Sequence, residues 1–198
     1  MRIRHFIQVA MVAGALSLAG SAWADDPQAI IKTQQEQVIN LLHQAQSGAR
    51  DAQVNAILDA MVDYDQLAQR CFAHHWDDLD DKQKAEVTDL LRQLVEKSWR
   101  RNLMKTLDYD VSYHGEQSGE SDGDQLVKTE AQSKTNRREP PVRVDYVMVN
   151  TNGWKVVDIV TEGSSLTANY GAQFHRMLTT DGEGYPYVVR RLKDKIHG

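Results

Sequence analysis

The hydrophobic pattern changes its period at Tyr109, and no other feature limits the possible folds as strongly. Before this residue, apolar positions recur every three or four residues, as on one side of a helix; from Tyr109 to about Thr161 apolar and polar residues alternate, as in a strand. Helical spacing returns near Ser165. Because helices precede and follow a meandering antiparallel sheet, we expect an α+β fold in which the helices cover one face of the sheet.

Helix signals divide the first part of the chain into four segments. A helix after Asp26 is expected to end near Ser47, and two shorter amphipathic helices follow, with Asp63 as a capping residue before the second. The longest helix begins near Asp80 and carries its apolar side past Trp99. This stretch is the most strongly periodic in the chain.

Four strands are expected in the alternating region, and two helices after it. The strands span residues 109–115, 125–134, 142–149 and 154–161, and the helices span residues 165–178 and 185–196. Asn152-Gly153 is a strong hairpin signal between the last two strands. Pro140-Pro141 places the start of the third strand at an edge or where the chain joins the sheet. In that strand the residues expected to face inward are Val142, Val144, Tyr146 and Met148.

The first 24 residues have the pattern of a cleavable secretory signal peptide. Arg2 and Arg4 precede an apolar run, which closes with the small residues Ala22 and Ala24 that a signal peptidase prefers. The run is shorter than the roughly 20 residues needed to span a bilayer. We therefore expect export to the periplasm and a single mature domain of residues 25–198.

Composition excludes several partners and chemistries. Without Arg2 and Arg4 the chain keeps 21 basic residues against 28 acidic ones, a net charge of −7, which disfavours nucleic acid and anionic membranes. The single cysteine, Cys71, lies on an apolar helix stripe and is expected to be a buried, inert thiol. No motif for covalent catalysis or phosphate binding is present.

The segment His74 to Asp78 contains two histidines and two aspartates but predicts no metal site. Adjacent residues on a helix point about 100° apart, so one helix could not direct all four side chains at one ion. Solvated helix ends explain the same residues. Asp158, within an apolar strand, is expected to hydrogen-bond backbone groups, although a role as a catalytic base stays open.

One segment carries a more specific signal. Residues 153–174 read GWKVVDIVTEGSSLTANYGAQF, which resembles the GWKVxDxxxEGxSLxxNYxxQF signature of the MlaC family, also called the toluene tolerance or phospholipid-binding family. Residues 64–76 and 80–99 resemble that family's helices. The chain departs from the family pattern at Gly171, where many members carry Arg, and at Cys71-Phe72-Ala73, where a Leu-Gly pair is common.

The resemblance implies a periplasmic phospholipid carrier that maintains outer-membrane lipid asymmetry. Such a carrier would hold acyl tails between helices and a curved sheet, a cone like that of nuclear transport factor two. Its partners would be an outer-membrane lipoprotein complex and an inner-membrane lipid ABC transporter with a lipid-binding ring subunit. It would need no cofactor or metal, because phospholipid is its cargo.

The resemblance supplies no catalytic motif, so the cavity lining is inferred from apolar residues on the expected inner faces. They are Tyr64, Leu67, Leu91, Leu94, Val95, Val142, Val144, Tyr146, Val157, Ile159, Leu166, Tyr170 and Phe174. Two alternatives stay open on the same type of fold: an isomerase-like enzyme with Asp158 as base, and an interaction module with a solid core and no ligand.

Overall fold

The computed structural model describes residues 26–198, and the expected signal peptide lies outside the described residues. Three helices come first, α1 (Pro27–Leu42), α2 (Gly48–Met61) and α3 (Tyr64–Phe72). A short 3₁₀ turn, η1 (Ala73–His75), leads to α4 (Asp81–Asn102), which η2 (Leu103–Asp108) joins to the sheet.

The sheet is an antiparallel meander in which the five strands are ordered β1-β2-β3-β4-β5. Its strands are β1 (Tyr109–Ser118), β2 (Gln125–Ser133), β3 (Val142–Asn150), β4 (Trp154–Thr161) and the very short β5 (Ser164–Ser165). Two helices follow, α5 (Leu166–Thr179) and α6 (Tyr185–His197). The α+β architecture predicted from the change of period is thus confirmed.

Side-chain caps explain where several helices begin. Asp26 accepts a hydrogen bond from the backbone of Ala29, and Asp63 accepts one from Gln66. Ser47 does the same for Arg50, so it begins α2. The prediction that the first helix ends near Ser47 was therefore wrong: α1 stops at Leu42, and a short linker precedes the cap.

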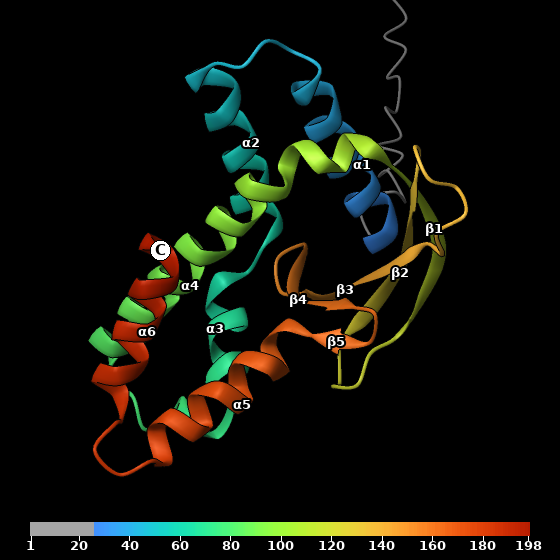
Figure 1. Ribbon diagram of the computed structural model, residues 1–198. Coiled ribbons are helices and arrows are strands. Elements are labelled where there is room, and N and C mark those ends of the chain that lie inside the picture. The colour runs from blue at the N-terminus through green and yellow to red at the C-terminus, as the bar shows by residue number, and fades with distance from the viewer. Residues whose placement is uncertain (1–25) are drawn as a thin grey trace, which may run out of the picture.

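The helices gather on one side of the sheet (Figure 1). Helix α1 lies beside β1 and β2, whereas α3 packs against α5, and α4 against α6. The main core contains Ile31, Phe72, Leu91, Met148 and Val188, each at most 1% exposed. Among residues 26–198, no helix is long and apolar enough to cross a membrane.

A β-bulge interrupts the pairing of β3 with β4. Val147 lies opposite Asp158, but its neighbour Met148 lies opposite Val156, so Val157 has no partner of its own. The alternation of inward-facing and outward-facing residues along β4 therefore shifts by one residue at this point. Val157 joins a second cluster, with Val147 and Val149, rather than the main core. β3 itself is paired on both sides and begins directly after Pro141.

Candidate functional site

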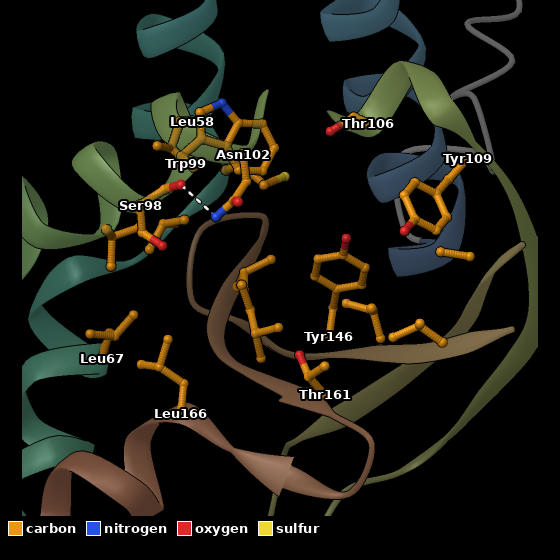
Figure 2. A pocket seen from close by; sticks show the side chains of 18 residues that line it. Leu58, Leu67, Ser98, Trp99, Asn102, Thr106, Tyr109, Tyr146, Thr161 and Leu166 are labelled. Atoms are coloured by element: carbon orange, nitrogen blue, oxygen red, sulfur yellow. Dashed lines mark hydrogen bonds between the residues drawn. The ribbon is translucent and has the colours of Figure 1, made fainter. Parts of the chain in front are cut away.

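A cavity of about 590 Å³ lies between the helices and the inner face of the sheet (Figure 2). Helices α2, α3, α4 and α5 contribute lining residues, as do η2 and the strands β1 to β4. Its aliphatic lining consists of Leu58, Met61, Val62, Leu67, Val95, Ala131, Val142, Val144, Val156, Ile159 and Leu166. A space of this size falls within the range of pockets that bury small-molecule ligands.

One part of the lining, from α4, contains polar and aromatic side chains. Figure 2 shows Ser98, Trp99 and Asn102 of α4 together, with the Asn102 amide donating a hydrogen bond of 3.0 Å to the Ser98 carbonyl oxygen. The indole Nε1 of Trp99 is buried and has no hydrogen-bond partner among the described residues. Asn102, Val142 and Thr161 are exposed lining residues, so the cavity is open to solvent.

Tyr146 points from β3 into the cavity (Figure 2). Its hydroxyl accepts a hydrogen bond of 2.9 Å from the Gln35 amide of α1, and Gln35 in turn accepts one from Tyr113. Burial raises the pKa of Tyr146. This phenol therefore stays neutral and holds α1 against the sheet.

Seven of the thirteen residues predicted from the sequence line this cavity. They are Leu67, Val95, Val142, Val144, Tyr146, Ile159 and Leu166. Leu91, Leu94 and Tyr170 line an adjoining pocket of about 290 Å³, which shares Val95, Ser98 and Leu166 with the main cavity.

The remaining three predicted residues lie elsewhere. Tyr64 lines a separate pocket with Asp63 and Thr88, and Phe174 is buried against Phe72, with ring centroids 4.8 Å apart. Val157 is fully buried in the second cluster, so its predicted inward orientation was wrong. The bulge is the physical reason, because it turns Val156 inward in place of Val157.

Sequence reasoning missed much of the helical lining. Leu58 and Met61 of α2 and Trp99 of α4 were recognisable as apolar helix positions but not as cavity residues. Ser98, Asn102 and Thr106 carried no signal, because a polar residue at a helix end is ordinarily solvated. Only the packing of the helices over the sheet places them at the cavity.

Asp158 lies away from the cavity. Its carboxylate accepts hydrogen bonds from the backbone N–H of Thr167 and Ile159, at 3.0 and 2.8 Å, and from the Ser165 hydroxyl. The side chain lines a polar pocket with Arg70 and Asp124 instead. This agrees with the structural role expected for it.

Three histidines meet outside the cavity. His74 and His75 of η1 lie beside His175 of α5, and their candidate ligand nitrogens are all within 4.8 Å of one another. Sequence reasoning considered only the segment His74 to Asp78. His175 carries no sequence signal, because it is about a hundred positions away.

Comparison with solved structures found a protein with a similar fold. The phospholipid-binding protein from Ralstonia solanacearum, solved in complex with a phospholipid, superimposes with a TM-score of 0.72 at 23% sequence identity. The alignment covers 87% of this chain and 97% of that protein. A search of curated proteins found no match to the chain. The family model for the MlaC protein matches residues 31–194, and the chain therefore belongs to the MlaC family.

Proposed function

We propose that the protein carries phospholipid across the periplasm as part of an intermembrane lipid-transport system. The MlaC family consists of lipid carriers rather than enzymes, and the solved relative from Ralstonia solanacearum holds a phospholipid. The observation that carries the proposal is the cavity of about 590 Å³ lined mostly by aliphatic side chains.

The volume of the cavity indicates how much of an acyl chain it can hold. If a methylene group occupies roughly the 30 Å³ of a liquid water molecule, about 590 Å³ accommodates roughly 20 methylenes. This is one acyl chain of ordinary length. At about 0.8 kcal/mol per methylene, removing such a chain of roughly 15 methylenes from water is favourable by about 12 kcal/mol. The adjoining pocket, of about 290 Å³, is by the same measure too small for a second whole chain.

The adjoining pocket supplies positive charge for a headgroup. Lys97, Arg101 and Lys195 line it, and none of the three forms an ion pair with a carboxylate within residues 26–198. Burial, and then the charge of Arg191, lower the pKa of Lys195. A phosphate would offset that repulsion. We place the phosphate there and the acyl chain in the main cavity.

Trp99 offers a second polar contact to the bound lipid. Its indole N–H is a buried donor without a partner in the described part of the chain, and such a donor costs about 1–3 kcal/mol if left unpaired. An ester carbonyl at the junction of headgroup and acyl chain is an acceptor of suitable chemistry.

The two alternative functions raised by the sequence have less support. Asp158, the proposed base of an isomerase-like enzyme, lies in a different pocket from the apolar cavity. An interaction module with a solid core does not account for the cavity.

Membership of the family supports a proposal about the cellular setting. We infer that residues 1–24 direct export and that residues 25–198 act as one domain in the periplasm. We infer also that this domain exchanges lipid with an outer-membrane lipoprotein complex and with the lipid-binding ring of an inner-membrane transporter.

Organic extraction of the untreated protein tests the proposal. The mature protein is purified from the periplasm without detergent, and the extract is analysed by mass spectrometry. About one phospholipid per chain is expected, whereas a chain free of lipid, or one holding a small metabolite, contradicts the proposal. Arg101→Glu and Lys195→Glu are expected to reduce the lipid content, and Lys32→Glu, on the exposed side of α1, is the control.

A further inference from the structure

The histidine cluster joins two segments that are far apart in the chain. His75 Nε2 lies 2.8 Å from His175 Nδ1, and the two ring centroids are 5.1 Å apart. The His74 ring lies 4.1 Å from that of His75 and 5.3 Å from that of His175. All three imidazoles therefore meet at one place on the surface, between η1 and α5.

The ring positions answer the objection that neighbouring histidines on a helix diverge, because the His74 and His75 ring centroids lie 4.1 Å apart. Helix α3 ends at Phe72, and Ala73 adopts φ 49° and ψ −126°, a region that residues other than glycine rarely occupy. The chain then continues as the 3₁₀ turn that holds both histidines. Backbone strain of this kind is often found at functional sites.

The candidate nitrogens, all within 4.8 Å of one another, would have to come to roughly 3.3 Å apart to hold a tetrahedral metal ion. Two nitrogens each about 2.0–2.1 Å from a tetrahedral Zn²⁺ lie roughly 3.3 Å from each other. The 2.8 Å separation of the His75 and His175 nitrogens therefore needs to widen by only roughly 0.5 Å. His74 and His175 are exposed, so both rings have room to adjust.

Asp78 lies on the side of the His75 ring opposite to His175. Its Oδ2 lies 3.6 Å from Nδ1 of His75, the nitrogen that faces away from His175. Metal-bound histidines commonly donate their second N–H to a carboxylate, which fixes the tautomer that offers the other nitrogen to the ion. At 3.6 Å this contact is longer than a hydrogen bond, so one of the two side chains would have to shift slightly before Asp78 could orient His75 in this way.

We propose that His74, His75 and His175 bind one divalent transition-metal ion, with Zn²⁺ as the favoured ion and water in the open coordination position. Imidazole nitrogens suit Zn²⁺, Cu²⁺ and Ni²⁺, whereas Mg²⁺ and Ca²⁺ prefer oxygen ligands. The bound ion would connect the end of α3 to α5, two helices that each contribute a lining residue to the cavity.

Calorimetric titration of the mature protein with ZnCl₂ tests the proposal. The protein carries no polyhistidine tag and is stripped with EDTA beforehand. We expect one Zn²⁺ per chain and a Zn²⁺-dependent rise in the thermal midpoint. His74→Ala, His75→Ala and His175→Ala should each weaken binding by about tenfold or more. His43→Ala, an exposed histidine at the end of α1, should leave binding unchanged.

Two results would overturn the three-histidine site: no Zn²⁺ binding by the unsubstituted chain, or undiminished affinity in either His74→Ala or His175→Ala. These two side chains are exposed, so their removal should not prevent folding, which circular dichroism checks. The outcome does not depend on lipid content. The metal site and the carrier function can therefore fail separately.

Discussion

Arg70 of α3 holds Asp124 through two parallel hydrogen bonds, of 2.7 and 2.9 Å, and so ties the helix to the turn before β2. The Asp124 side chain is only 3% exposed, whereas that of Arg70 is 27% exposed. Hydrogen bonding to Asp124 raises the pKa of Arg70, so the guanidinium stays charged. The pair fixes one end of the sheet against the helical layer.

We predict that Arg70→Met lowers the free energy of unfolding by about 2–4 kcal/mol, because it leaves the Asp124 carboxylate buried without its partner. Urea unfolding measures this loss. Arg92→Met is the matched control, since Arg92 makes ion pairs with Asp59, Asp89 and Glu96 but is 44% exposed. That change should cost less than about 1 kcal/mol. Equal losses in the two variants would contradict the assigned importance of burial.

The β-bulge yields a second prediction from two nearby residues of β4. Ile159→Trp adds its indole to the cavity, so the fold should survive while bound phospholipid falls. Val157→Trp adds the same group to a fully buried cluster and should cost about 1–3 kcal/mol through overpacking, without displacing lipid from folded chains. Thermal unfolding and lipid extraction distinguish the two effects. Equal effects of the two substitutions would mean that the strand alternates without a bulge, because residues 157 and 159 would then share one face.

Ala73→Gly should stabilise the protein by about 1 kcal/mol, because φ 49° with ψ −126° suits glycine and strains alanine. Ala172→Gly, at an exposed position within α5, is the control and should destabilise by about 0.5–1 kcal/mol. Both values come from urea unfolding at one pH. A loss of stability in Ala73→Gly would show that the alanine methyl group makes contacts that outweigh the strain.

Cys71 provides a prediction at alkaline pH. Burial, and then the charge of Asp158, raise the pKa of its thiol from 9.0 to about 12. A raised pKa in the folded state means that the unfolded chain loses this proton first. The resulting stability is present below pH 9 and declines as the pH rises toward 12, by up to about 1.4 kcal/mol per pH unit.

The Cys71→Ala variant isolates this contribution from the buried tyrosines, whose pKa values are raised as well. Between pH 9 and 11 the free energy of unfolding should fall less steeply for Cys71→Ala than for the unsubstituted protein. Parallel curves would show that the thiol ionises alike in both states. Lipid content at neutral pH should be the same in the two proteins, because Cys71 does not line the cavity.

Much of the fold was predictable because local signals and tertiary packing agree. The strand at residues 154–161 and the hairpin before it follow from alternation and the Asn-Gly step, and the structure has β4 at the same bounds. Ser47 shows how a local signal can be misread. A serine between two apolar stripes fits the end of one helix or the cap of the next, and only its hydrogen bond to Arg50 decides.

The cavity lining was less predictable, since a residue facing a cavity and a residue facing a solid core are both apolar. The prediction for Val157 was wrong for a different reason. A bulge depends on the pairing of β4 with β3, which the alternation of apolar and polar residues does not reveal. His175 could not be linked to His74 either. Their proximity results from the packing of α3 against α5, which involves segments distant in sequence.

Every strand of the sheet pairs with strands next to it in the chain, and β4 makes in addition an isolated parallel bridge between Val156 and Val62. The pairings between neighbouring strands close short loops, so they cost little chain entropy and can form early in folding. The helices that cover the sheet come from both ends of the described chain, and they can meet over it only after long-range contacts form. We therefore expect the strand pairings to form before the helices pack over the sheet. A chain folding in this order needs no ligand as a template, so an empty cavity is compatible with complete folding.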